Sequence, residues 1–325
     1  MTPNEEKRIR QLNAELSDTA KIILFETSHE KNNEIRQFCE TLSRLVPKIR
    51  VQKEDGDPDA HPMIGIGNGL RYQGIPAGTE LEPFLEALAF NDSGTTSLPE
   101  ALQNRLNRLE LPAILSLYVA PQCKFCPQVV RSLLPLPGIN TNIKLIIIDG
   151  TQFPELMQEH NIQAVPTLLL DDQFRWTGSV DLNEIIDLMI DRDSSLLGGS
   201  SLEMILKDGH AAQLARMMLD EDKIFRAFYD VLTHQSWSTR LGAMVVMEEL
   251  VSQRPQLAAR VINPLWERFN EVSEQVKGDI LHVFGEIGSP DAVSLLQSVL
   301  SAGHSEDVKE AAEEALGKIR RHAGK

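Results

Sequence analysis

The sequence contains few cysteines and no long apolar run. Cys39, Cys123 and Cys126 are the only cysteines among 325 residues. A secreted protein held together by disulfides usually carries more, in an even number, so a close pair is expected to be catalytic or metal-binding. No stretch approaches the 18 apolar residues of a membrane span, and the N-terminus lacks a basic segment followed by an apolar one. We therefore expect a cytoplasmic protein.

The chain also has fewer basic than acidic side chains. The chain carries 47 acidic and 32 basic side chains, for a formal net charge of −15, and the acidity is spread along the whole length. Such a field repels nucleic acid and anionic lipid surfaces. We therefore expect neither nucleic acid nor a membrane as a partner, and the oligomeric state stays open.

Residues 1–96 and 97–193 are predicted as two copies of one α/β unit. Each copy has a polar helix, an apolar strand, a further helical stretch, a proline that begins an apolar run, and a closing amphipathic helix. Helices and strands in this order predict a central sheet. The matching segments are 5–18 and 99–110, then 21–25 and 112–118, then the runs from Pro62 and Pro166, then 81–90 and 182–190.

The second copy is about twelve residues longer than the first. The extra residues lie around 153–162 and predict a short helix, whereas the first copy has the acidic loop 54–59 there. Under this alignment Lys31 and Glu34 stand where the second copy has its two cysteines. The first copy is therefore predicted to have no dithiol chemistry.

The chain changes character at 194–201, where Gly and Ser dominate and predict a linker. In 202–325 we find no strand pattern. Helical segments that start at Ser236, Ser273 and Ser305 repeat at spacings of 37 and 32 residues. Repeating helix pairs of this period predict an all-α solenoid, and Ser at the head of each segment fits helix capping.

The segment from Cys123 to Cys126 is the strongest chemical signal. It follows an apolar strand across a short loop and precedes an apolar helix, which places Cys123 near a helix N-terminus. There the dipole and free N–H groups stabilise a thiolate. We expect Cys123 to attack a substrate disulfide and the more buried Cys126 to resolve the mixed disulfide. The expected modulators of this pair are Lys124, Phe125 and Pro127.

Pro166 lies 43 residues after Cys123 and directly precedes a predicted strand. Proline in such a position needs a special reason, and a cis bond between Val165 and Pro166 beside the sulfurs would supply one. The Val165 backbone would then be available to pair with an extended client segment. A proline there would also crowd the site and discourage a metal.

Metal binding is the main alternative to redox chemistry for the cysteine pair. A zinc or iron–sulfur site usually needs four ligands, and Cys39, inside the predicted helix 34–45, is expected to be a small core residue. The eight histidines are scattered, with no metal-binding spacing, so no metal is predicted. No flavin or nicotinamide fingerprint is present. The cysteine pair itself is the only redox group expected.

Residues 1 to about 192 resemble a tandem thioredoxin-fold module. Similar proteins are the N-terminal domain of the alkyl hydroperoxide reductase flavoprotein subunit and the glutaredoxin-like protein disulfide oxidoreductases. The segments that carry the resemblance are 71–78, 123–127, 148–150, Phe153 and 164–166. The resemblance implies that Cys123 attacks, Cys126 resolves and Pro166 is the cis-proline. It also implies a first unit without a redox pair.

The family pattern is not followed everywhere. Thioredoxins carry a buried acid on the strand before the cysteine pair, and Leu117 stands at that place here, so proton transfer through a buried carboxylate is not expected. The chain also continues without flavin or nicotinamide domains. From about Ser201 onward it resembles HEAT repeats instead, and these usually bind proteins.

The sequence therefore predicts a thiol–disulfide oxidoreductase, mainly a protein disulfide reductase active in cell redox homeostasis. The helical domain would dock a client, such as a peroxiredoxin-like protein, or an electron donor. The donor would be a separate flavoprotein or thioredoxin system. The alternative is a non-enzymatic scaffold or chaperone in which the cysteine pair is only a redox-sensitive clasp.

Overall fold

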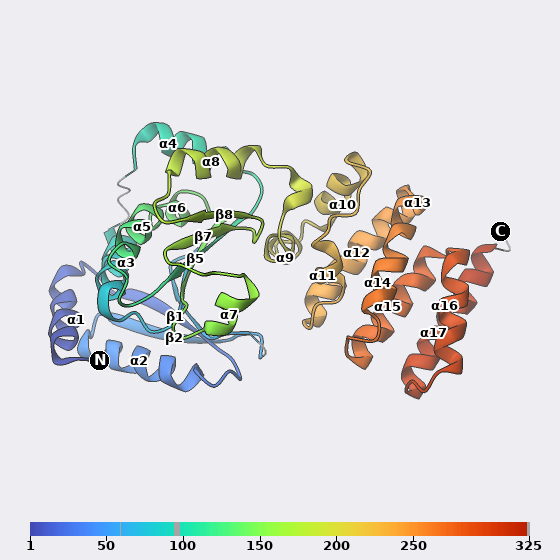
Figure 1. Cartoon of the computed structure of the whole chain (residues 1–325), viewed down its shortest axis with the longest axis horizontal. Helices are drawn as coiled ribbons and strands as arrows, with labels where there is room; N and C mark the ends of the chain where they lie inside the picture. The colour runs from blue at the N-terminus through green and yellow to red at the C-terminus, as the bar shows by residue number, and fades with distance from the viewer. Residues whose placement is uncertain (59, 94–97, 324–325) are drawn as a thin grey trace. The chain divides into compact units, whose positions relative to one another are not determined.

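The computed structural model describes residues 1–58, 60–93 and 98–323, and the chain divides into two units (Figure 1). The first unit spans Met1–Arg192 and the second spans Asp193–Lys325. The first is α/β and the second is helical, as the sequence predicted. The predicted boundary between the two α/β copies, at 96–97, lies outside the described residues. Among the described helices, none has the length and apolar character needed to cross a membrane.

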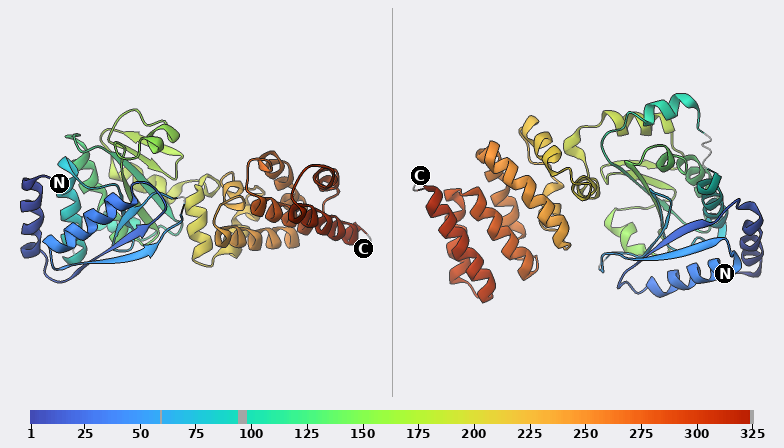
Figure 2. Two further views of the ribbon diagram at one scale, coloured as in Figure 1. Left: turned by 90° about the horizontal axis from the view of Figure 1, so that it is seen from below. Right: turned by 180° about the vertical axis from the view of Figure 1, so that it is seen from behind.

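An eight-stranded sheet lies at the centre of the first unit, in the order β2-β1-β3-β4-β6-β5-β7-β8. The two halves of this sheet repeat one pattern. Figure 2 shows the sheet and its helices from two further sides. β1 is parallel to β2 and antiparallel to β3, while β5 is parallel to β6 and antiparallel to β7. The strands are β1 (Ala20–Glu26), β2 (Ile49–Asp55), β3 (Met63–Ile66), β4 (Leu70–Gln73), β5 (Ala113–Val119), β6 (Ile143–Asp149), β7 (Thr167–Leu170) and β8 (Phe174–Thr177).

The two halves share one continuous sheet because β4 pairs in parallel with β6. β5 lies deepest, and all seven of its residues are buried. Its apolar sequence fits a strand that is covered on both faces. Tyr118, near the end of β5, pairs with Thr167 at the start of β7. This register brings the loop after β5 next to the proline that precedes β7.

Helices and short 3-10 turns cover the sheet of the first unit. α3 packs against β1, β3 and α5, so a helix of the first half contacts a helix of the second. α4 packs against α6 and α8. These elements are α1 (Pro3–Glu15), α2 (Asn32–Leu45), η1 (Gly78–Glu80), α3 (Leu81–Ser93), α4 (Glu100–Leu106), α5 (Cys126–Leu133), α6 (Leu136–Ile139), α7 (Pro154–Glu159) and α8 (Leu182–Asp191).

The second unit consists of helices and 3-10 turns in its described residues. α12, α15 and α17 begin directly after Ser236, Ser273 and Ser305, as the repeat predicted. α12 packs against α10 and α15, and α15 packs against α17. The elements are η2 (Ser194–Leu196), α9 (Gly199–Lys207), α10 (Ala211–Asp220), α11 (Phe228–Leu232), α12 (Trp237–Gln253), α13 (Pro255–Ala258), η3 (Ala259–Val261), α14 (Ile262–Arg268), α15 (Glu274–Ile287), η4 (Pro290–Ala292), α16 (Val293–Ser301) and α17 (Glu306–Ala323).

Residues 194–201, predicted as a linker, are structured. They form η2 and the first turn of α9. The Asp193 side chain accepts a hydrogen bond from the Ser195 backbone N–H at 2.8 Å, and both Ser195 and Ser201 are buried. Capping by Asp193 and the burial of two serines accompany these helical turns.

Candidate redox site

The Cys123 loop lies between the most buried strand of the sheet and an amphipathic helix. β5 ends at Val119 and α5 begins at Cys126. The Cys123 N–H donates to the Ala120 carbonyl at 3.0 Å, which closes a tight turn after the strand. The apolar residues on one face of α5 then fix the helix against the core, including the buried Val129 and Val130. The loop is thus held at both ends by buried structure.

Cys123 and Cys126 form a disulfide, with their Cα atoms 5.6 Å apart. The two sulfurs differ in exposure, because Cys123 is half-buried and Cys126 is fully buried. The Cys126 backbone N–H points at the Cys123 Sγ, 3.1 Å away. A free N–H at the start of a helix stabilises negative charge on that sulfur. The geometry therefore favours Cys123 as the thiolate that meets a substrate.

Val165 and Pro166 lie directly against this disulfide. The Val165–Pro166 peptide bond is cis, at the position where the sequence predicted a cis-proline. The Val165 carbonyl oxygen is 3.8 Å from the Cys123 Sγ. Val165 is half-buried and Pro166 is buried. A backbone edge beside a reactive sulfur can pair with an extended polypeptide.

The first half of the sheet braces the cysteine loop through η1. The Thr79 N–H donates to the Pro121 carbonyl at 2.9 Å, and the Thr79 hydroxyl donates to the Cys123 carbonyl at 2.9 Å. Gly78 allows this approach, since its φ is +59° and an added Cβ would lie 2.5 Å from the Pro121 carbonyl oxygen. The redox loop of the second half is therefore positioned by residues of the first.

The residue after Thr79 is a buried acid that the sequence did not predict. Glu80 is only 4% exposed, and neither carboxylate oxygen has a hydrogen-bond partner among the described residues. Burial, together with the nearby negative charge of Asp149, raises the pKa of Glu80 to about 7. Leu117, at the place of the usual thioredoxin acid, is fully buried. Glu80 is therefore a buried carboxyl that the first half of the sheet contributes, on a different element from Leu117.

Glu80 could not be found from a local signal. An acid just before an amphipathic helix is usually explained by the helix dipole, so the position predicts an exposed first turn. Its burial arises because η1 packs against α5, a contact between segments about 45 residues apart. Only the shared sheet brings these two segments together.

A groove of about 380 Å³ opens beside the disulfide. The predicted modulator Phe125 lines it and is 74% exposed, which is unusual for an aromatic side chain. Lys124 is exposed, and Pro127 occupies the first turn of α5. The groove is lined by Phe125, Gln128, Val129, Ser132, Val165, Pro166, Gly178, Ser179 and Val180. Its mixed apolar and backbone lining suits a peptide segment.

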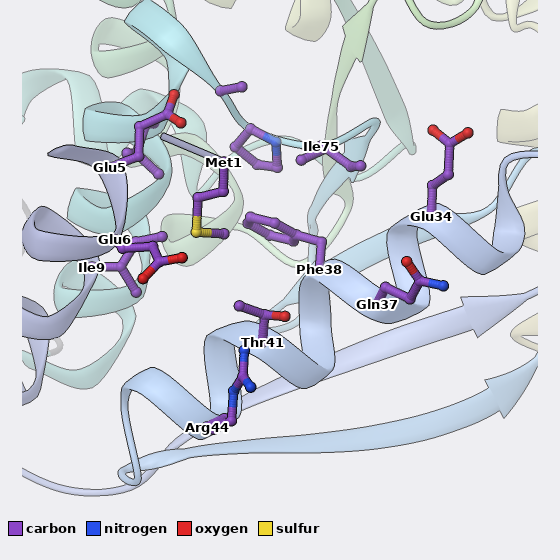
Figure 3. A pocket seen from close by; sticks show the side chains of 13 residues that line it. Met1, Glu5, Glu6, Ile9, Glu34, Gln37, Phe38, Thr41, Arg44 and Ile75 are labelled. Atoms are coloured by element: carbon purple, nitrogen blue, oxygen red, sulfur yellow. The ribbon is translucent and has the colours of Figure 1, made fainter. Parts of the chain in front are cut away.

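A second cavity, of about 390 Å³, lies between α1 and α2 in the first half (Figure 3). Its lining includes the acids Glu5, Glu6 and Glu34, the base Arg44 and the aromatic Phe38. No thiol or imidazole is among the described residues that line it. The cavity therefore adds no redox chemistry, and the disulfide groove is the candidate site.

The first half carries no cysteine at the corresponding place, but the aligned residues differ from those predicted. α2 begins at Asn32 and α5 at Cys126, so the residue three positions before each helix is His29 or Cys123. The alignment that placed Lys31 and Glu34 there was wrong by two residues, because strands and helices are offset by 93 and 94 positions and not by 92. Cys39 lies in α2 and is fully buried. Burial raises the pKa of its thiol to about 12.

Together, the fold and this site define a thioredoxin-like domain with a cysteine pair. The family model described as "Thioredoxin domain" matches residues 115–191. The F subunit of alkyl hydroperoxide reductase from Staphylococcus epidermidis is 26% identical over 162 residues, which is 49% of this chain and 32% of that protein. Its Escherichia coli counterpart is 24% identical over 161 residues, which is 48% of this chain and 31% of that protein. The matches thus span about a third of the length of these curated relatives.

Two solved structures share the fold. The NTD N/C domain of the alkylhydroperoxide reductase AhpF from Enterococcus faecalis has a TM-score of 0.50 and 26% identity, covering 58% of this chain and 99% of that one. A protein disulfide oxidoreductase from Aeropyrum pernix has a TM-score of 0.50 at 14% identity, covering 58% and 92%. The N-terminal part of the chain is therefore a thioredoxin-fold domain similar to both, with the Cys123–Cys126 pair in its second half.

Proposed function

We propose that the protein is a thiol–disulfide oxidoreductase that reduces disulfides in other proteins. The observation that carries this proposal is the asymmetry of the pair, with a half-buried Cys123 whose Sγ lies 3.8 Å from the Val165 carbonyl oxygen and a fully buried Cys126 behind it. An attacking thiol must reach its substrate, whereas a resolving thiol only needs to reach the first sulfur.

In the reduced enzyme, the Cys123 thiolate attacks one sulfur of the client disulfide. A bond forms between Cys123 and the client, and the other client sulfur leaves as a thiolate. Cys126 then loses its proton and attacks the Cys123 Sγ, which releases the second client thiolate and closes the Cys123–Cys126 disulfide. Two electrons pass to the client, and its two sulfurs take up protons. A separate reductant must reopen the enzyme disulfide.

We propose that Glu80 is the proton acceptor for Cys126, because it is a buried carboxyl in η1, which packs against α5, the helix that begins at Cys126. A carboxyl whose pKa is about 7 changes protonation near the pH range in which thiols ionise. Thr79 ties its segment to the Cys123 loop. Replacing Glu80 with glutamine should lower the rate of mixed-disulfide resolution and flatten its pH dependence, while the rate of the first attack changes little.

A trapping experiment tests the reaction directly. In a Cys39→Ala background, the Cys126→Ser variant should hold protein clients as mixed disulfides through Cys123. The matched Cys123→Ser variant keeps the buried thiol but should trap none, because Cys126 is fully buried. Equal trapping by both variants, or reduction of protein disulfides that persists in the double serine variant, would refute the assignment.

The direction of electron flow is read from the potential of the pair, measured by equilibration with glutathione or with a dithiol of known potential. Thioredoxin-type reductants lie near about −270 mV and strong oxidants near about −120 mV. We propose a value near the reductant end. A value near the oxidant end would make the protein an oxidase of client thiols instead.

We propose a peroxiredoxin-like protein as the client class, because the curated relatives are named as F subunits of alkyl hydroperoxide reductase. The donor would be a separate flavoprotein or a thioredoxin system. Each pairing can be measured as electron transfer to the Cys123–Cys126 disulfide or from the reduced pair, in a mixture of purified proteins. Failure to reduce any peroxiredoxin disulfide at a useful rate would redirect the search to other clients.

We further propose that residues 1–96 and 97–193 are tandem thioredoxin-like folds, and that the second unit is a HEAT-like solenoid that docks the client or donor. The repeated strand order supports the first point. Three exposed apolar residues on α12 support the second, Trp237, Leu241 and Val245, since the spacing of four places them on one face. Replacing all three with Ser should raise the KM for a protein disulfide. It should leave the rate with a small aromatic disulfide unchanged.

The rival proposal is a redox-sensitive scaffold without turnover. Under it the α12 substitutions would abolish protein binding, but the Cys123 thiol would exchange slowly with any disulfide. Stopped-flow measurement of thiol exchange in the reduced protein separates the two proposals.

A further inference from the structure

Two histidines and a glutamate converge in the first unit, outside the redox site. The Glu155 carboxylate oxygen is 3.1 Å from the His61 Nε2 and 3.8 Å from the His29 Nε2. All three candidate ligand atoms lie within 4.8 Å of one another. The residues are far apart in sequence, so their spacing gives no metal-binding motif. The fold alone creates this cluster.

The cluster occupies the place in the first half that the redox site occupies in the second. His29 lies three residues before α2, as Cys123 lies three residues before α5. His61 directly precedes Pro62 and β3, as Val165 directly precedes Pro166 and β7. In the second half, these two positions hold Cys123 and Val165. In the first half, the equivalent positions hold His29 and His61.

The third member comes from the insertion that only the second half has. Glu155 belongs to α7, which has no counterpart helix among the described residues of the first half. Beside it, the buried Phe153 contacts both imidazoles, with ring centroids 5.5 Å from His29 and 5.2 Å from His61. Both histidine side chains are about one-fifth exposed and Glu155 is about half exposed. The two imidazoles therefore pack against Phe153, while the Glu155 carboxylate is accessible to solvent.

We propose that His29, His61 and Glu155 bind one divalent transition-metal ion of the Zn²⁺ type. Two imidazole nitrogens and one carboxylate oxygen form a common zinc ligand set that leaves a fourth position for water or a small ligand. Metal–ligand bonds of about 2.0–2.1 Å at tetrahedral angles separate the ligand atoms by roughly 3.3 Å. The two separations from the Glu155 oxygen, 3.1 and 3.8 Å, are close to that value. All three atoms lie within 4.8 Å of one another, so binding requires the two imidazoles to approach each other.

Two hydrogen bonds must be exchanged on binding. One joins His61 Nε2 to the Glu155 carboxylate at 3.1 Å, and both of its atoms become metal ligands. The other is at His29. The Lys31 backbone N–H donates to the His29 Nδ1 at 3.1 Å, so the proton of neutral His29 is on Nε2 in the metal-free protein. A metal at Nε2 moves that proton to Nδ1 and breaks the bond from Lys31. The loop is solvent-accessible, and water can then accept from Nδ1 and bind the freed amide. The metal site therefore costs two hydrogen bonds and gains three ligand bonds.

The test is an equilibrium titration of the full-length protein with Zn²⁺ against a chromophoric chelator. It is done with the Cys123–Cys126 disulfide closed, because reduced thiols bind zinc themselves. We expect one ion per chain. His29→Gln, His61→Gln and Glu155→Gln should each weaken binding by more than about 100-fold, beyond the roughly 10–100-fold typical of outer-shell changes.

His160→Gln is the matched control. The His160 side chain is also about one-fifth exposed, and its Nδ1 lies 3.8 Å from a carboxylate oxygen of Asp172. It does not belong to the group of candidate metal ligands found among the described residues. Its substitution should leave the zinc affinity unchanged within about threefold. If the oxidised protein binds no zinc, or if the three substitutions weaken binding no more than His160→Gln does, the proposal is refuted.

A second measurement needs no variant and so cannot fail through misfolding. In the wild-type protein, Zn²⁺ should protect His29 and His61 from acylation by diethyl pyrocarbonate, read by peptide mass spectrometry, and should leave His160 reactive. Equal reactivity of His29 and His61 with and without the ion would overturn the site. Neither experiment depends on the thiol chemistry, so the redox proposal stands or falls separately.

Discussion

Relative to the wild type, the Glu80→Gln variant should gain stability in its first unit as the pH rises from acid to alkaline values. The carboxyl is 4% exposed and its oxygens have no hydrogen-bond partner among the described residues. Its ionised form is therefore poorly solvated in the folded protein. Glutamine has the shape of the protonated acid and cannot ionise, so it removes the penalty without opening a cavity.

The size of the effect follows from the pKa difference. Burial, and then the charge of Asp149, raises the pKa of Glu80 from 4.5 to about 7. At about 1.4 kcal/mol per pKa unit, the full penalty is about 3 kcal/mol. The pKa of Glu80 is higher in the folded protein than in the unfolded chain. The penalty is therefore absent below about pH 4.5, and the free energy of unfolding falls as the pH rises from there through about 7. Above that pH the difference between variant and wild type is constant. The glutamine amide would also be buried without a hydrogen-bond partner, which costs free energy in the variant. The gain in stability at alkaline pH is therefore at most about 3 kcal/mol.

The assay must report on the first unit alone, since a two-unit chain need not unfold in one step. Trp176 is the only tryptophan of that unit, because the others are Trp237 and Trp266. In a Trp237→Phe, Trp266→Phe background, its fluorescence follows unfolding of the first unit in urea. The free energy of unfolding is measured from about pH 5 to 8.5, with the disulfide closed, to span the folded pKa.

Glu100→Gln is the control, because Glu100 is an exposed acid in the first turn of α4. It should shift the free energy by less than about 0.5 kcal/mol at every pH. A free-energy difference between the Glu80→Gln protein and the wild type that stays constant across the range would refute the reasoning. It would mean that Glu80 is hydrated or paired and ionises normally in the folded protein.

Three further substitutions or measurements test the packing around the site. Gly78→Ala should cost at least about 1 kcal/mol more than Gly178→Ala in the same urea assay, because both have positive φ but only the first would press a Cβ onto backbone. Arg192→Leu should cost about 3–5 kcal/mol, since Asp171 would lose its fully buried cationic partner. Cys39, whose pKa is about 12, should not react with an aromatic disulfide in the oxidised native protein, and one thiol should appear on unfolding. Three outcomes would contradict the packing described. They are equal costs of the two glycine variants, a cost below about 1 kcal/mol for Arg192→Leu, and a Cys39 thiol that reacts in the native protein.

Local patterns were sufficient for the elements of the fold. The segments 21–25 and 112–118 were predicted as strands and lie within one residue of β1 and β5, because apolar runs bounded by polar segments determine strands. The serines at 236, 273 and 305 marked helix starts because capping is a local interaction. The segment 194–201 was assigned wrongly because glycine and serine serve equally in flexible chain and in capped, tightly packed turns.

The site was predictable only where its chemistry is encoded by adjacent residues. The cysteine pair and the Val165–Pro166 step are sequence motifs, and the loop after β5 brings them together. Glu80 and the His29–His61 pair have no such motif. Each depends on pairing between strands or packing between helices distant in the chain, and a single sequence does not contain that information in any local window. The one-residue difference between the two strand–helix loops also moved the alignment by enough to miss His29.

The cysteine loop rests on both halves of the sheet, so the half without the cysteine pair has a structural role at the redox site. β4 supplies the neighbour that keeps β6 from being an edge strand, and an unpaired edge would expose backbone to aggregation. Thr79 binds the carbonyl of Cys123, and the next residue, Glu80, is a buried carboxyl. The second half alone would keep both sulfurs but lose all three contributions. The first half is therefore part of the redox site's structure, although its own corresponding position carries histidines.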